Sequence, residues 1–118
     1  MDWKESFKEG KELVLSTCSN SKKPNANIVL SLGFLEDNLM IADCQMETTI
    51  KNLRENPKIC VIGGYFKILG TVKIFSTGGI FNKCSKIVAS QDKTIKAKNI
   101  INISVEEVFD LDEGKKII

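Results

Sequence analysis

The residues best suited to bind a ligand lie in one segment, Thr48 to Pro57, which reads TTIKNLRENP. Ile50 and Leu53 share a face at helical spacing, so a short helix that ends at the proline is expected. Free backbone N–H groups at a helix start, with roughly half a positive charge from the helix dipole, favour a bound anion. A phosphate there would accept hydrogen bonds from these groups and from a threonine hydroxyl while pairing with Lys51. The segment therefore suggests phosphate binding.

The cap of this expected helix leaves donors for a ligand. Thr48 or Thr49 is the expected N-cap, but neither has Glu or Gln three residues on, because those positions hold Lys51 and Asn52. The reciprocal capping box is therefore missing, and a phosphate would satisfy the donors that remain. The alternative is a plain threonine-capped surface helix with a solvated lysine.

The composition is that of an ordinary globular protein. Its 118 residues fit a single domain, residues 1–118, and 42% hydrophobic with 27% charged residues argue against disorder. The net charge of +2 is too small to indicate nucleic acid or an anionic membrane as a partner. No apolar run approaches the roughly 18 residues that span a bilayer, and the start lacks a signal-peptide pattern, so we expect a cytoplasmic protein.

Several kinds of catalytic and metal site are excluded by residues that the chain lacks. It has no histidine, which removes Ser-His-Asp and Cys-His nucleophilic schemes and any His-ligated metal. The four cysteines are far apart and form no C-x-x-C pair, so we expect no metal site. They are Cys18, Cys44, Cys60 and Cys84, and buried free thiols are their expected state.

Short apolar runs separated by turn formers predict six strands. Their approximate ranges are 13–18, 25–34, 39–44, 58–66, 68–75 and 101–105. Besides the central helix, helices are expected near 3–12 and 80–88. Gly63-Gly64 suggests a bulge or a close backbone approach, and the charged tail 110–118 is expected to fray. This order predicts a mainly β fold, a six-stranded antiparallel barrel with two to three short helices, and an open α+β sandwich is the alternative.

Three parts of the sequence together resemble one known family. They are Leu13 to Thr17 as a first strand, Lys23-Pro24-Asn25-Ala26 at the start of the second, and Thr49-x-Lys51-Asn52-Leu53 followed by Asn56-Pro57. In order and spacing they are similar to the FMN-binding split-barrel family, which includes pyridoxamine 5′-phosphate oxidase and small bacterial FMN-binding proteins. The resemblance covers most of the chain and implies a split barrel that binds FMN.

The resemblance also implies which residues would line the cofactor. In the family the helix pattern contributes to the flavin phosphate site, which assigns that role to Thr49 and Lys51, with Thr48 and Asn52 beside them. The second strand lies along the flavin ring, which implies mainly backbone contacts from Ile28, Val29, Leu30 and Ser31. The end of the third strand, Ala42-Asp43-Cys44, would line the ribityl chain. A small buried hydrophobe is the alternative interpretation of the cysteine.

The function that the resemblance implies is a homodimeric flavoprotein with the flavin at the subunit interface. It would pass electrons or hydride to a small molecule or a redox protein, with no catalytic side chain assigned. Oxidation of vitamin B6 is not expected, because the chain has one arginine, Arg54, and lacks the histidine of the family's substrate motif. The alternative function is a barrel without flavin that binds a small ligand, or an acidic partner through the lysines of Lys83 to Lys98. An oligonucleotide-binding barrel is disfavoured, because aromatic and basic residues do not alternate along any expected strand.

Overall fold

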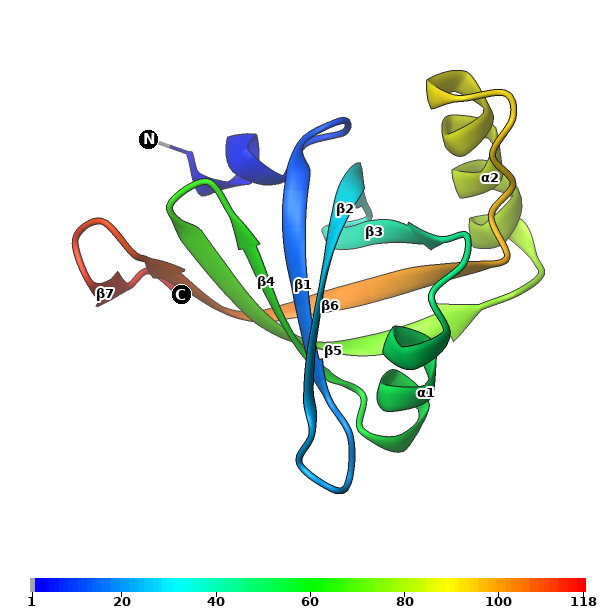
Figure 1. Ribbon diagram of the computed structural model, residues 1–118. Coiled ribbons are helices and arrows are strands. Elements are labelled where there is room, and N and C mark those ends of the chain that lie inside the picture. Colours follow the sequence, from blue (N-terminus) through cyan, green and yellow to red (C-terminus); the bar gives the residue numbers. More distant parts are fainter. Residues whose placement is uncertain (1) are drawn as a thin grey trace.

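The computed structural model describes residues 2–118 and confirms the mainly β architecture (Figure 1). A 3-10 helix, Trp3–Phe7, precedes the first strand. The strands are β1 (Glu12–Cys18), β2 (Pro24–Leu35), β3 (Asn38–Asp43), β4 (Lys58–Gly63), β5 (Phe66–Phe75), β6 (Asn99–Asp110) and β7 (Lys115–Lys116). The helices are α1 (Glu47–Glu55), between β3 and β4, and α2 (Gly79–Gln91), between β5 and β6. In Figure 1 both helices lie on one side of the strands, and β7 with the C-terminus lies on the other.

Six of the strands close into an antiparallel barrel, which β7 extends at one edge. The hydrogen-bonded order is β3-β2-β1-β4-β5-β6-β7, and β3 also pairs with β6. That last pairing runs from Leu39 opposite Ile103 to Asp43 opposite Asn99 and completes the ring of strands. Closure gives strand partners to groups that an open sheet would leave unpaired at its edges. The predicted six-stranded barrel is therefore confirmed.

The inward faces of the strands form the main hydrophobic core. Along β1, buried and more exposed residues alternate, as expected for a strand with one face in a barrel. The fully buried large side chains are Phe7, Leu13, Leu15, Leu39, Met40, Ile41, Ile68, Ile100, Ile101, Ile103, Val61 and Val108. A smaller cluster under α2 contains Cys84 and Val88, one helical turn apart, with residues of β2, β3 and β6. This cluster fixes α2 beside the barrel.

A bulge in β6 shifts the pairing of that strand with β5 by one residue. The pairing of β5 with β6 shifts between Leu69 and Gly70, which leaves Glu106 as an extra residue on β6. A Cβ atom at position 70 would lie 2.4 Å from the carbonyl oxygen of Ser104. Only glycine therefore fits where the two strands approach each other beside the bulge.

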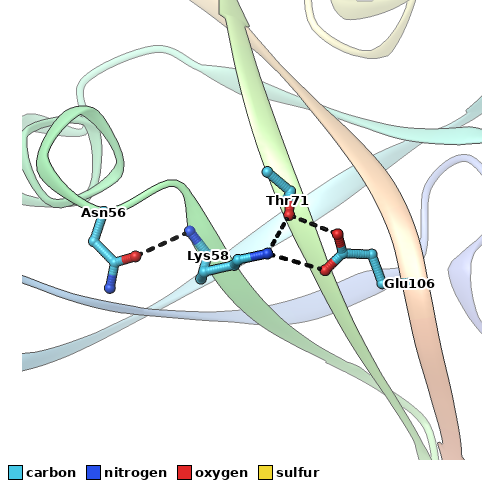
Figure 2. A network of polar contacts seen from close by, with 4 residues as sticks. All are labelled: Asn56, Lys58, Thr71 and Glu106. Carbon is cyan, nitrogen blue, oxygen red and sulfur yellow. Dashed lines mark hydrogen bonds and ion pairs between the residues drawn. The ribbon is translucent and has the colours of Figure 1, made fainter.

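The bulged residue is held from outside by side chains of β5 and of β4, the next strand beyond it, as Figure 2 shows. The hydroxyl of Thr71 donates to Glu106 Oε2 at 2.8 Å, and Lys58 Nζ donates to Glu106 Oε1 at 3.4 Å and to Thr71 Oγ1 at 2.9 Å. The side-chain oxygen of Asn56 accepts from the backbone N–H of Lys58. The threonine hydrogen bond, with a further contribution from the lysine, lowers the pKa of Glu106. The network ties β4, β5 and β6 together.

The first half of β2 has a strand partner on one side only. Residues 24–30 pair with β1, whereas pairing with β3 starts at Ser31. On the other side of residues 24–30, no strand of residues 2–118 is paired with β2, and α1 approaches instead through Thr49, whose hydroxyl is 3.1 Å from Asn25 Nδ2. This gap between β2 and β3 is the split in the barrel.

The start of α1 differs from the prediction. Met46 is the N-cap and the helix begins at Glu47, so neither Thr48 nor Thr49 caps it. The cause lies before the helix, where Asp43 Oδ1 accepts from the backbone N–H of Met46 at 2.6 Å. This hydrogen bond turns the chain earlier than a threonine cap would.

Three other local predictions were corrected, the first of them only in part. Gly63-Gly64 is no bulge, because Gly63 pairs with Phe66 and the chain reverses between them. The expected close approach is present, since a Cβ at Gly63 would lie 2.8 Å from Phe7. The tail does not simply fray, because Lys115 and Lys116 pair with the end of β6. The first helix is also shorter than expected, a single 3-10 segment that ends at Phe7.

Candidate functional site

A polar cavity lies between α1 and the hairpin that joins β1 to β2. Its volume is about 460 Å³, within the range of small-molecule sites. One flank of α1 forms a wall, because Thr48, Lys51, Asn52 and Glu55 recur at helical spacing. The hairpin contributes Ser19, Ser21, Lys23, Pro24 and Asn25. The lining is therefore made of hydroxyls, amides and two ammonium groups around a single carboxylate.

The charges of this cavity favour an anion. Lys23 and Lys51 form no ion pair with any carboxylate of residues 2–118. The carboxylate in the lining, Glu55, accepts from the backbone N–H of Asn20 at 3.1 Å. A phosphate between the two lysines would gain two charge-assisted partners, with the hydroxyl of Thr48 as a further donor.

The cavity runs along the flank of α1 and does not centre on the helix N-terminus. The first turn of α1 contains Glu47, an acidic residue that complements the helix dipole itself. The groups that line the cavity lie at positions 48, 51, 52 and 55. Side chains, more than the helix dipole, would therefore hold an anion here.

An apolar cavity, also of about 460 Å³, lies across the split, between β2 and the end of β3. Its lining comes from β2, from the end of β3 and the turn after it, and from the end of α2 with the connection that follows. The residues are Asn27, Ile28, Val29, Leu30, Leu32, Ala42, Cys44, Gln45, Met46, Val88, Gln91, Asp92 and Ile95. Walls that are mostly aliphatic, with three side-chain amides and the carboxylate of Asp92, suit a flat ring system that carries polar atoms.

A hydrogen-bond network joins the walls of the two cavities. Asn25, in the polar cavity, donates through Nδ2 to Asn27 Oδ1, in the apolar cavity, at 3.0 Å. The same nitrogen donates to the hydroxyl of Thr49 at 3.1 Å, and that hydroxyl donates to Asn27 Oδ1. These three side chains therefore lie between the two cavities, with Asn25 facing the polar one and Asn27 the apolar one.

Most of the residues implied by the family resemblance line one cavity or the other. Those in the apolar cavity are Ile28, Val29, Leu30, Ala42 and Cys44. Those in the polar cavity are Thr48, Lys51 and Asn52. Asn52 also donates to the hydroxyl of Thr17 at 3.1 Å, so its amide is partly engaged within the protein.

Three of the implied residues, Ser31, Asp43 and Thr49, line neither cavity. Ser31 is fully buried, and its hydroxyl donates to the carbonyl oxygen of Phe7. Asp43 is 1% exposed and joins β3 to β6 and to the start of α1. The hydroxyl of Thr49 is engaged in the network with the two asparagines. Each of these side chains already has partners within the protein.

Several lining residues were not identified as site residues from the sequence, although Lys23 and Asn25 belong to one of the motifs shared with the family. Asn25 and Asn27 alternate with exposed residues on β2, and this period-two pattern of amides was a usable signal. Lys23 lies in a turn, where a lysine is ordinary. Gln91 and Ile95 reach the apolar cavity only because α2 packs beside β3, which no local pattern reveals.

The thiol of Cys44 has the chemistry of a buried apolar group. Partial burial and, after it, the neighbouring carboxylate of Asp43 raise the pKa of this thiol. It is therefore protonated at neutral pH and is a poor nucleophile. This favours a packing contact with a ligand over a chemical role for the cysteine.

Residues 2–118 contain no group of three or more His, Cys, Asp and Glu side chains arranged to hold a metal ion. Among the helices of the same residues, none has both the length and the apolar character needed to cross a membrane.

Comparison with known proteins decides the family. The family model named "Pyridoxamine 5'-phosphate oxidase" matches residues 2–112. The chain belongs to the pyridoxamine 5'-phosphate oxidase family. An uncharacterized protein of Methanocaldococcus jannaschii is 24% identical over 114 residues, which cover 90% of this chain and 76% of that protein.

Solved structures of similar fold agree with this membership. HupZ from Group A Streptococcus has a TM-score of 0.80 at 20% identity, over 91% of this chain and 90% of that one. An FMN-binding protein from Syntrophomonas wolfei has a TM-score of 0.74 at 15% identity, over 90% of this chain and 79% of that one. Identities this low show the shared fold, the split barrel, and nothing finer.

Proposed function

We propose that this member of the pyridoxamine 5'-phosphate oxidase family binds FMN, with the phosphate in the polar cavity and the ring system in the apolar cavity. The observation that carries the proposal is that the two cavities lie side by side, because Asn25 of the polar cavity is hydrogen-bonded to Asn27 of the apolar cavity. A phosphate monoester carries between about one and a half and two negative charges at pH 7, which Lys23 and Lys51 would balance. The FMN-binding protein of the same fold supports this choice of ligand.

The bound flavin would supply hydride or electron transfer, and the protein would supply binding and orientation. Val29 and Leu30 would cover the ring with aliphatic surface and exclude water from it. Lys51 would hold the phosphate at the other end and so fix the position of the ring along the split. We assign no catalytic residue, and we propose an oxidoreductase or electron carrier whose electron partner is a small molecule or a redox protein.

We propose further that the protein acts as a homodimer with the flavin at the subunit interface. Ile28 is 74% exposed, Leu30 48% and Val14 37%. Ile28 and Val14 lie directly opposite each other on β2 and β1, so they form one apolar patch on the outer barrel wall. A second copy packed on this patch would cover it and close the apolar cavity from outside.

A cytoplasmic location is part of the proposal, and the four free thiols are compatible with a reducing compartment.

Titration with FMN and with riboflavin tests the proposal, because the two ligands differ only in the phosphate. The wild-type protein is expected to bind both and to bind FMN more tightly. Lys51→Ala is expected to weaken FMN by about tenfold, the loss of a charge-assisted hydrogen bond, and to leave riboflavin nearly unchanged. Lys86→Ala, an exposed lysine of α2 away from both cavities, is the matched control. A wild-type protein that binds neither flavin, by absorbance and by melting temperature, would refute the proposal.

A specific observation favours a second candidate, an interaction module for an acidic protein. The segment from α2 to the start of β6 carries five lysines against one aspartate, and none of the five pairs with a carboxylate of residues 2–118. The lysines are Lys83, Lys86, Lys93, Lys96 and Lys98. Binding to an acidic partner that weakens steeply with salt, in a protein that shows no flavin binding, would favour this candidate.

A further inference from the structure

We propose that Thr49 is a positioning residue, which holds Asn27 so that its amide N–H groups meet the ligand in the apolar cavity. This inference rests on the proposed flavin binding and gives Thr49 a different role from that of a phosphate ligand. It also makes Asn27 a contact residue for the ring system or the chain attached to it.

The geometry of Thr49 leaves its hydroxyl no proton for a phosphate. The residue is 1% exposed and lines neither cavity. Its hydroxyl has one proton, which it donates to Asn27 Oδ1, and it accepts from Asn25 Nδ2 at 3.1 Å. The only proton of the hydroxyl is therefore used within the protein. Thr48, one residue earlier, is exposed and lines the polar cavity.

The same network fixes the orientation of the Asn27 side chain. Its carbonyl oxygen accepts from Asn25 Nδ2 at 3.0 Å and from Thr49, so it points toward α1. The two N–H groups of Asn27 Nδ2 donate to no atom of residues 2–118, while the residue lines the apolar cavity. An amide held in this way presents donors to a ligand without first losing side-chain freedom.

The fixed donors of Asn27 define what the ligand must offer. They select an acceptor, a carbonyl oxygen or an unprotonated ring nitrogen, at the end of the apolar cavity nearest to the polar one. FMN and riboflavin share the ring system and the ribityl chain and differ in the phosphate alone. Loss of the positioning hydroxyl should therefore weaken both ligands equally, whereas loss of a phosphate contact should weaken FMN only.

The test compares Thr49→Val with Thr48→Val, two neighbouring threonines that each lose one hydroxyl at nearly constant volume. Thr49→Val is expected to weaken FMN and riboflavin alike, by about tenfold, the effect of one hydrogen bond. Thr48→Val is expected to weaken FMN alone. Thr49→Ser, which keeps the hydroxyl, is expected to restore both affinities. Loss of FMN affinity alone in Thr49→Val would show a phosphate ligand and overturn the inference, as would unchanged affinity for both flavins.

A double-mutant cycle keeps the inference testable if Thr49→Val lowers stability. Asn27→Ala removes the proposed contact directly, and Thr49→Val added to it is expected to cause no further loss of affinity for either flavin. Additive losses would show that the two residues act independently and would overturn the inference. Melting temperatures of the flavin-free variants report stability separately. A wild-type protein that binds neither flavin refutes the proposed function itself, whereas additive losses in a flavin-binding protein refute only the role of Thr49.

Discussion

The carboxylate of Asp43 accepts a hydrogen bond from the side-chain amide of Asn99 at 2.7 Å, across the β3–β6 pair that closes the barrel. Its other oxygen accepts from the backbone N–H of Met46, the N-cap of α1, at 2.6 Å. One buried carboxylate therefore connects the β3–β6 pair with the N-terminus of α1, the helix that carries Lys51. The position of the polar cavity depends on these two hydrogen bonds.

Asp43→Asn is expected to lower the free energy of unfolding by about 1–3 kcal/mol. An asparagine has one acceptor oxygen for two buried donors, so its NH₂ group would face either Asn99 Nδ2 or the Met46 N–H. Urea denaturation measures the change. Asp37→Asn, at an exposed turn position with positive φ that asparagine tolerates, is the control and is expected to stay within about 0.5 kcal/mol of wild type. Equal stability of the two variants would contradict the role given to Asp43.

Gly70→Ala is expected to destabilise the barrel by roughly 1–3 kcal/mol, because the new methyl group would overlap the Ser104 backbone beside the bulge. Gly79→Ala is the matched control, since nothing lies within 4 Å of a Cβ there and the residue starts α2. Alanine in a helix should leave stability unchanged or raise it by up to about 1 kcal/mol. Thermal melts of both variants measure the difference, and a Gly70 variant as stable as wild type would show that β6 can move away from β5.

Ile28→Glu is expected to convert the proposed homodimer to a monomer, because it puts a charge in the centre of the apolar patch on β1 and β2. Leu111→Glu changes an exposed leucine that follows the far end of β6, and it should leave the dimer intact. Sedimentation velocity without added FMN separates this effect from any change in flavin binding. Wild-type protein that sediments as a monomer at micromolar concentration would count against the dimer.

The thiol of Cys44 is expected to react with iodoacetamide more slowly than a cysteine in a short peptide. Only the thiolate reacts, and burial together with Asp43 raises the pKa of this thiol, so less thiolate is present at any pH below the raised value. The rate should rise with pH up to that value. FMN should slow the reaction further, because Cys44 lines the apolar cavity. Peptide mapping by mass spectrometry follows each cysteine separately, and Cys60, on β4, lines neither cavity and should be insensitive to FMN.

Much of the fold could be predicted from local patterns. Short apolar runs separated by turn formers identified six strands, and Pro57 and the spacing of Ile50 and Leu53 identified α1. The length of β6 and its bulge could not be predicted, because they depend on Gly70 of another strand. Long-range pairing leaves little trace in the sequence of either strand.

The candidate site could be predicted in composition but not in geometry. Of the residues that the family resemblance implied, Lys51 and, on β2, Ile28, Val29 and Leu30 line cavities, whereas Ser31 does not. The sequence suggested an anion at the helix N-terminus, whereas the cavity lies along the helix flank beside Lys23, which only the folded hairpin brings near. From the sequence, either Thr48 or Thr49 is expected to cap the helix, and the family resemblance assigns the phosphate contact to Thr49. Helical periodicity turns one toward the cavity and the other into the protein.

Native mass spectrometry of the protein after addition of FMN tests the central claim most directly, because it reports the bound ligand and the number of chains together. We predict a species with the mass of two chains and two FMN molecules, and Lys51→Ala should lose FMN from it at lower collision energy than Lys86→Ala. A spectrum with no FMN-bound species at a saturating concentration would contradict the account.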